Sequence, residues 1–253
     1  MKSLLLDIGN SRLKWGIGEG GAIRRTGHIS RQRIREHGLQ VLTTKLPRRV
    51  DAVMASNVAG ASFATRLSGV ISAHCDCDVR FAKSESHAFG ITNSYRQPRT
   101  LGVDRWVAMI GAFAEFRAAG VIVDAGTAVT IDALDEDGVH LGGQILPGVT
   151  LMADALSSST SDIPSVARAA KGTGDAMNMF ASSTADAVRE GALNAVVGAI
   201  ERSIRLLRSN DYDPVVILTG GDGSRILGAI DAAVEHRPNL VLQGLLYMLE
   251  TGK

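Results

Sequence analysis

Two aspartates stand at matching places in the two halves of the chain, each directly after a short apolar run. Asp7 opens the turn Asp-Ile-Gly-Asn, and Asp124 opens the turn Asp-Ala-Gly-Thr 117 residues later. A carboxylate at a strand end faces the crevice where open α/β sheets bind ligands, and the glycine lets a phosphate approach the backbone. Carboxylate and phosphate repel each other by roughly 3 kcal/mol at about 5 Å and an effective dielectric of about 20. We therefore expect hard cations beside both aspartates, although either one alone would also fit a hairpin cap.

A third carboxylate, Asp104, lies beside an arginine at the start of a predicted helix. Asp104 could accept the proton of a substrate hydroxyl, while Arg105 could hold an anionic substrate through a bidentate contact. The alternative role for Asp104 is that of a helix N-cap. The pair therefore predicts either a catalytic base with its anion-binding partner or an ordinary helix start.

Glycines gather in two further segments, of which one is a candidate nucleotide contact. The turn Thr219-Gly220-Gly221-Asp222-Gly223 lies between a predicted strand and a predicted helix, so it could contact the edge of a nucleotide or form a plain tight turn. The segment Gly16-Ile17-Gly18-Glu19-Gly20-Gly21 has the spacing of a dinucleotide-binding motif. We interpret this match as coincidental, because Ala22–Ile29 predicts a strand where that motif needs a helix. The sequence also contains no P-loop and no G-x-S-x-G motif.

The composition argues against several classes of protein. The 253 residues include 27 Lys and Arg against 26 Asp and Glu, a formal net charge of +1. This balance, with only 2 Trp, 3 Tyr and 6 Phe, is not typical of a nucleic-acid-binding protein. No uninterrupted apolar run approaches the roughly 20 residues of a membrane span, so we expect a soluble, cytoplasmic protein with no membrane partner.

The pattern of apolar residues predicts alternating strands and helices around these turns. A Ser-, Asn- and Pro-rich loop is expected over 84–100, and Asp135-Glu136-Asp137-Gly138 is typical of a hairpin turn. Helices are predicted over 31–46, 61–73, 104–119, 184–207 and 240–249, and strands over 3–7, 13–17, 22–29, 51–58, 78–83, 121–124, 127–134, 139–145 and 214–218.

The repeat of the Asp-x-Gly turn after an apolar strand and before a hairpin indicates a duplicated half-domain. We therefore predict an α/β protein of two lobes, 1–118 and 119–253, that face each other across a central cleft. The last helix is expected to pack back on the first lobe. The helix over 184–207, with Ala185, Val188, Ala192, Ala195 and Ala199 on one stripe, could lie in the core or at an interface.

Taken in order, the motifs resemble those of the type III pantothenate kinases, which belong to the actin, heat-shock chaperone ATPase and sugar kinase superfamily. Ser11 stands where the family usually has Thr, a change that keeps the hydroxyl. The motifs that carry the resemblance are Asp7-Ile8-Gly9-Asn10-Ser11-Arg12-Leu13-Lys14-Trp15, Tyr95, Gly102-Val103-Asp104-Arg105-Trp106, Val123-Asp124-Ala125-Gly126-Thr127-Ala128, Gly142-Gly143-Gln144-Ile145-Leu146-Pro147-Gly148 and Thr219-Gly220-Gly221-Asp222.

The resemblance implies two duplicated actin-like (ribonuclease H-like) lobes and ATP-dependent phosphorylation of pantothenate to 4'-phosphopantothenate, the first step of coenzyme A biosynthesis. The alternatives are another small-molecule kinase of the superfamily and a non-catalytic nucleotide-binding regulator. Retention of Asp7, Asp104 and Asp124 favours a kinase, since a regulator needs no base. The resemblance also implies a homodimer whose active sites use both subunits.

Site roles follow from the resemblance residue by residue. Asp104 is expected to be the general base, Asp124 the ligand of a monovalent cation (potassium or ammonium), and Asp7 the residue that organises magnesium. Pantothenate is expected to contact Tyr95, Gly102, Val103, Arg105 and Thr184, the last across the dimer interface. ATP is expected to contact Asp7, Ile8, Gly9, Asn10, Ser11, Arg12, Leu13, Lys14, Thr127, Gly220 and Gly221. Without the resemblance, Tyr95 would also fit a half-buried loop aromatic and Thr184 a helix N-cap.

Overall fold

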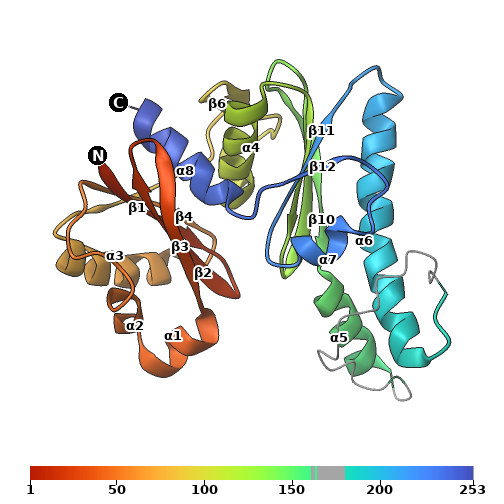
Figure 1. The fold of residues 1–253 in the computed structure, drawn as a ribbon, viewed down its shortest axis with the longest axis horizontal. Helices are drawn as coiled ribbons and strands as arrows, with labels where there is room; N and C mark the ends of the chain where they lie inside the picture. The colour runs from red at the N-terminus through yellow and green to blue at the C-terminus, as the bar shows by residue number, and fades with distance from the viewer. Residues whose placement is uncertain (161–162, 164–179, 253) are drawn as a thin grey trace. The chain divides into compact units, whose positions relative to one another are not determined.

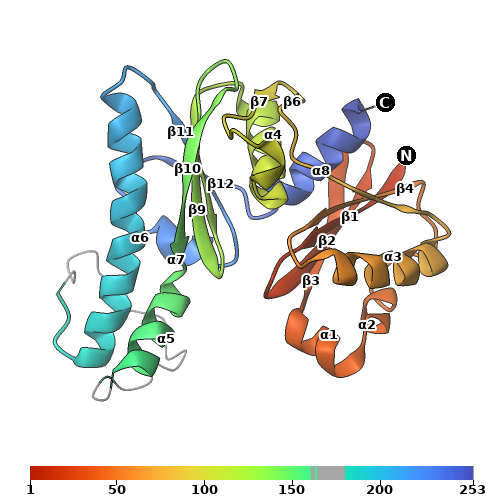
Figure 2. The ribbon, with the colours of Figure 1, turned by 180° about the vertical axis from the view of Figure 1, so that it is seen from behind.

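The structure is a computed structural model, which describes residues 1–160, 163 and 180–252. The chain divides into two compact units, each built on a five-stranded sheet. The first unit consists of Met1–Arg117 and Asn239–Lys253, and the second of Ala118–Pro238. Figures 1 and 2 show the elements of each unit from opposite sides.

The first unit has a mixed sheet with the strand order β3-β2-β1-β4-β5. Strands β1, β2 and β3 form an antiparallel meander, and β4 and β5 continue the sheet parallel to β1. The strands are β1 (Lys2–Ile8), β2 (Arg12–Glu19), β3 (Ala22–Ser30), β4 (Ala52–Asn57) and β5 (Val79–Phe81). Because side chains alternate along a strand, Leu4, Leu6 and Ile8 point into one buried cluster, and Asp7 lies on the opposite face.

Helices cover both faces of this sheet. The cluster around Leu4 and Leu6 packs against α1 (Arg31–His37), α2 (Gln40–Thr43) and α3 (Ala61–Cys75), which Figure 1 shows together along one face. The other face is covered by α8 (Leu240–Thr251), which also packs against α4 (Val103–Phe116). Between β5 and α4 lie the short β6 (His87–Ala88) and β7 (Ile91–Thr92) and a 3-10 turn, Pro98–Thr100.

The second unit repeats the same topology, with the strand order β10-β9-β8-β11-β12 and the same strand directions. This repetition confirms the predicted duplication and the α/β class. The strands are β8 (Gly120–Ala125), β9 (Ala128–Leu134), β10 (His140–Pro147), β11 (Val215–Thr219) and β12 (Val234–His236), and the helices are α5 (Val149–Ser159), α6 (Thr184–Arg208) and α7 (Gly223–Leu227).

The glycines of the coincidental dinucleotide motif have a packing role. Gly16 and Gly18 lie in β2, on the face that α8 covers. A Cβ at Gly18 would stand 2.9 Å from Leu246 Cδ1 of α8 and 2.4 Å from Ser3 Oγ, and one at Gly16 would stand 3.3 Å from Leu242 Cδ1. The residues after them form β3, as predicted, so the segment is a β-hairpin. Because these glycines have no side chains, α8 can pack closely against this face of β2.

Three details of the sequence prediction were wrong. The single helix over 31–46 is two short helices, because the chain at Gly38 has a φ of 76°, which a helix cannot continue through. The three-residue strand β12 was not predicted. The buried stripe of α6 runs through Val188, Ala192, Val196 and Ile200 and not through Ala195, which is exposed.

Candidate active site

The first Asp turn, residues 7–12, joins β1 to β2. The Gly9 N–H donates to the Arg12 carbonyl at 3.1 Å and closes the turn. The Arg31 N–H donates to the Ser11 carbonyl at 2.8 Å, which ties the turn to the start of α1. Asn10, Ser11 and Arg12 are exposed, so their side chains can reach a ligand.

Asp7 lies between two polar residues on the neighbouring strands. It faces Lys14 of β2 across an antiparallel pair and Ser56 of β4 across a parallel pair, so all three side chains share one face of the sheet. Ser56 is 1% exposed, and its Oγ has no hydrogen-bond partner among the described residues. Sequence reasoning missed Ser56, because only the strand register places it beside Asp7.

The second Asp turn, residues 124–128, joins β8 to β9 in the same way. The Gly126 N–H donates to the Ala128 carbonyl at 3.0 Å. Two other predicted motifs dock on this turn through backbone hydrogen bonds: the Gly148 N–H donates to Thr127 O at 2.8 Å and the Asp222 N–H to Ala125 O at 2.9 Å. The structure therefore brings three separate motifs of the second unit together.

Glycine is required at two of these contacts. A Cβ at Gly148 would stand 2.3 Å from the Gly126 carbonyl oxygen, and one at Gly220 would stand 2.3 Å from the Ala125 carbonyl oxygen. Gly220 also has a φ of 97°, in the region that favours glycine. The turn after β11 is therefore held directly against the second Asp turn, whose Thr127 is exposed beside it.

Asp124 has oxygen-bearing neighbours on both sides. It faces Thr130 of β9 and Thr219 of β11, at the positions that Lys14 and Ser56 hold around Asp7. The alternation along each strand places the three side chains on the face opposite the buried cluster of Val121 and Val123. The neighbour across the antiparallel pair is therefore a lysine in the first unit and a threonine in the second.

The start of α4 gathers the predicted substrate residues of the first unit. Arg105 is 5% exposed, and its Nη1 donates to the Tyr95 hydroxyl at 3.0 Å. The Arg105 backbone N–H donates to Asp104 Oδ1 at 2.8 Å. A Cβ at Gly102 would stand 2.8 Å from that same Oδ1, so glycine leaves room for the carboxylate. Asp104, Arg105, Gly102 and Tyr95 thus form one cluster.

Two buried polar residues hold the loop that carries Tyr95, and sequence reasoning missed both. Asn93 Nδ2 donates to the carbonyls of Glu85 and Pro98 at 3.1 and 3.2 Å, and Asn93 Oδ1 accepts the Tyr95 N–H at 3.0 Å. Ser84 Oγ donates to the Leu101 carbonyl at 2.9 Å. The Ser- and Asn-rich composition indicated a loop, but not which of its polar side chains turn inward.

The remaining predicted residues are placed as follows. The N-cap of α4 is Gly102, so the N-cap alternative for Asp104 was wrong. The N-cap of α6 is Ser183, whose Oγ accepts the Asp186 N–H at 3.2 Å, so the N-cap alternative for Thr184 was also wrong. Thr184 is the exposed first residue of α6, and Val103 is the half-buried first residue of α4. Ile8 and Leu13 are fully buried, which leaves only their backbone atoms for a ligand.

Comparison with known proteins decides the family. The family model described as type III pantothenate kinase matches residues 3–206. The chain belongs to the type III pantothenate kinases. The Thiobacillus denitrificans type III pantothenate kinase is 36% identical over 250 residues, which cover 98% of this chain and 97% of that protein. The Nitrosococcus oceani enzyme is 35% identical over 251 residues, with coverage of 96% and 91%. This kinase accordingly phosphorylates pantothenate with ATP, a reaction of coenzyme A biosynthesis.

Solved structures agree on the actin-like fold of the kinase. A conserved Campylobacter jejuni protein assigned to the Baf family of transcriptional activators has a TM-score of 0.62 at 21% identity, with 98% of both chains covered. The activator of 2-hydroxyisocaproyl-CoA dehydratase from Clostridium difficile, with bound ADPNP, has a TM-score of 0.53 at 15% identity, with 99% and 95% covered. Among the helices that the structure describes, none is long and apolar enough to cross a bilayer.

Proposed function

We propose that Asp104 is the general base of this pantothenate kinase and that Arg105 and Tyr95 bind the substrate beside it. The observation that carries the proposal is the cluster at the start of α4, where a carboxylate, a buried guanidinium and a phenol meet. Phosphoryl transfer depends on positioning and charge neutralisation, so the residues needed are a proton acceptor and an anion holder. Asp104 accepts the hydroxyl proton of pantothenate, and Arg105 binds its carboxylate.

The rigidity of the cluster supports this assignment. Arg105 is buried and its guanidinium is directed by the Tyr95 hydroxyl, while Asn93 holds the backbone of Tyr95. A binding residue fixed by a second layer of hydrogen bonds loses little side-chain freedom when substrate binds. Gly102 and Val103 line the same helix start and complete the substrate contacts.

The two Asp turns are proposed to bind the phosphates of ATP, through the exposed Asn10 and Ser11 of the first and Thr127 of the second. Gly220 and Gly221 would contact the nucleotide from the turn that docks on Thr127's loop. The backbone N–H groups of such turns form ready anion sites, and their glycines admit the ligand. In this arrangement the residues of these turns act on ATP only by positioning it and through their charge.

The side chains around both aspartates fit hard cations. Asp7 and the Ser56 hydroxyl, which has no partner among the described residues, are oxygen ligands suited to magnesium or to its bound water. Asp124, Thr130 and Thr219 form an all-oxygen set suited to potassium or ammonium. These ions, when bound, would offset the negative charge of the phosphates.

The lysine–threonine difference explains why the second turn would need a monovalent cation. Lys14 supplies a fixed positive charge directly across from Asp7. Thr130, at the equivalent position, supplies none to Asp124. A cation taken from solution would therefore be needed to offset the repulsion between Asp124 and a phosphate. This need supports Asp124 as the potassium or ammonium site.

The proposal is tested by ADP release with pantothenate against a panel of sugars and sugar acids, each with and without potassium. We expect ADP only with pantothenate, and more of it with potassium present. ADP release with a sugar and not with pantothenate would overturn the substrate assignment.

A homodimer with shared active sites is also proposed, and α6 offers the surface for it. The outer face of this helix is an exposed stripe of small residues, Ala187, Gly191, Ala195 and Gly198. Two glycines cost a solvated helix roughly 1 kcal/mol each relative to alanine, so their use here favours close packing against another backbone. A Cβ at Gly191 or Gly198 would meet open space on the described surface. Thr184 is exposed on the same helix, where it could reach a partner's pantothenate.

Ala195→Glu should convert the dimer to a monomer, because it places a charge and a long side chain in the middle of the stripe. Ala195→Ser is the matched control, since it keeps the side chain small. Sedimentation velocity measures the masses. A dimer that survives Ala195→Glu would place the interface elsewhere and would end the case for Thr184 acting across it.

A further inference from the structure

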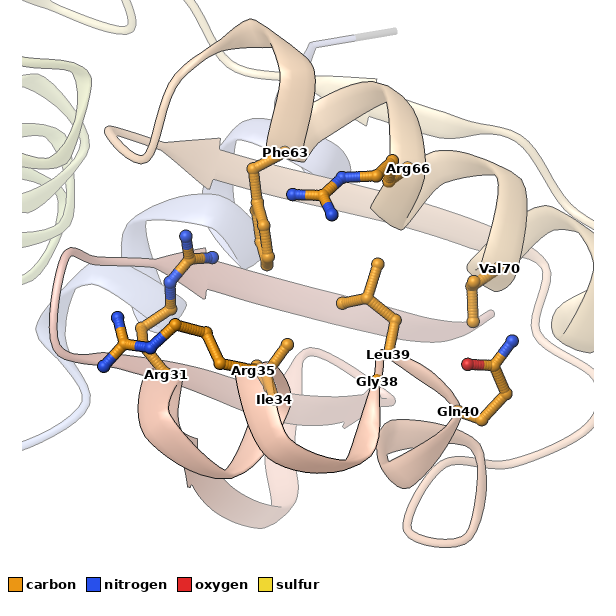
Figure 3. A pocket seen from close by; sticks show the side chains of 9 residues that line it. All are labelled: Arg31, Ile34, Arg35, Gly38, Leu39, Gln40, Phe63, Arg66 and Val70. Atoms are coloured by element: carbon orange, nitrogen blue, oxygen red, sulfur yellow. The ribbon is translucent and has the colours of Figure 1, made fainter.

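The first unit contains a hollow lined by three arginines, away from the residues assigned to the kinase reaction. It lies between α1 and α3 and has a volume of about 540 Å³, within the usual range of small-molecule sites. Figure 3 shows Arg31 and Arg35 extending from α1 and Arg66 from α3. The Phe63 side chain points from α3 toward α1. Leu39 and Val70 form part of its apolar wall.

The residues that the structure describes do not neutralise the positive charge of this hollow. None of the three arginines forms a salt bridge with a residue in the part of the chain that the structure describes. Burial, together with the charges of Arg35 and Arg66, lowers the pKa of Arg31. Three like charges therefore share one small space, at a cost that a bound anion would remove.

Arg31 shows the clearest sign of a missing partner. Its guanidinium carbon lies 3.5 Å from the centroid of the Phe63 ring, and that of Arg66 lies 6.0 Å from the same centroid. The ring holds Arg31 in place. Its Nη1 is nevertheless buried and has no hydrogen-bond acceptor among residues 1–160, 163 and 180–252. A buried donor of this kind needs an acceptor, which the described part of the chain does not provide.

We propose that this hollow, the Arg31 pocket, is a second anion site that binds a small molecule through a di- or polyphosphate group. A group with several negative charges matches three guanidinium groups that line one hollow, whereas a single carboxylate would leave most of the positive charge unpaired. The concave shape favours a small ligand over a protein surface. The apolar wall at Leu39 and Val70 would accommodate the rest of such a molecule.

The pocket is separate from the Asp7 face but linked to the same turn. It opens on the α1 and α3 side of the sheet, whereas Asp7 and Lys14 lie on the α8 side. The Arg31 N–H nevertheless donates to Ser11 of the first Asp turn at 2.8 Å. A ligand bound to Arg31 would therefore contact a residue that supports the first Asp turn, without occupying the turn itself.

The test uses inorganic pyrophosphate as the probe on the full-length kinase. Hydrogen exchange localises the bound probe, and titration calorimetry gives its Kd. We expect protection of peptides that cover 31–43 and 61–75, and a Kd raised about ten-fold or more in both Arg35→Gln and Arg66→Gln, the usual loss for a charge-assisted contact. Pantothenate, with its single carboxylate, should not protect these peptides.

Arg33→Gln is the matched control, because Arg33 is exposed on α1 but does not line the pocket. It should leave the Kd unchanged, and none of the three substitutions should change the basal kinase rate. The proposal is overturned if pyrophosphate protects only the Asp turns, if its binding survives both pocket substitutions, or if Arg33→Gln weakens it equally. A rise in the KM for ATP in parallel with the Kd would make the pocket part of the nucleotide site and would also overturn it.

Discussion

Replacing Asp104 with Asn should lower kcat by roughly 10²–10⁴-fold, the contribution of a positioned general base, while the Kd for ATP stays unchanged. The substitution removes the proton acceptor and little else. The amide oxygen of Asn can still accept the Arg105 N–H that Asp104 Oδ1 accepts at 2.8 Å. The helix start and the Arg105–Tyr95 contact should therefore persist.

The measurement is steady-state ADP release with saturating pantothenate, together with calorimetry of ATP binding. Glu115→Gln is the control, because it makes the same chemical change at an exposed position of the same helix. A kcat equal to that of the unmodified kinase would remove Asp104 from the role of base. Loss of ATP binding along with activity would instead indicate a structural role.

The local patterns of the sequence were enough to predict the duplicated architecture and the two Asp turns. An apolar strand followed by Asp-x-Gly is a signal contained in a few residues, and it occurs at Asp7 and again at Asp124. The same holds for the pair Asp104–Arg105 at a helix start. The fold follows because each turn is joined to the same meander of strands, which the structure confirms in both units.

Residues whose role depends on strand register or on a distant partner could not be predicted. Ser56 and Thr219 become neighbours of the aspartates only when parallel strands pair, and no periodic signal marks them. Asn93 is one polar residue in a polar loop, and its inward orientation follows from the carbonyls it meets. The packing role of Gly18 could not be predicted, because the helix that it admits, α8, lies at the other end of the chain.

The second large effect concerns the cation at the second Asp turn. In the unmodified kinase, removal of potassium and ammonium should lower the rate about 10²-fold, since the unshielded repulsion between Asp124 and a phosphate is roughly 3 kcal/mol and each 1.36 kcal/mol is a factor of ten. Asp124→Ala should make the rate independent of potassium, because it removes the cation ligand and the repelling charge together. Its rate should lie below that of the potassium-saturated kinase.

A potassium titration of ADP release at constant ionic strength, with choline chloride as the balancing salt, measures this dependence. Melting temperature provides a readout that does not rely on turnover: potassium should raise it for the unmodified kinase and not for Asp124→Ala. Asp137→Ala, at the exposed tip of the hairpin that follows Asp124, is the matched control and should keep both responses. If Asp124→Ala kept both the rate and the potassium response of the unmodified kinase, the cation would bind elsewhere, and Thr130 would not be part of its site. If the variant became slow but still potassium-dependent, Asp124 would act on the phosphate turn itself and not through an ion.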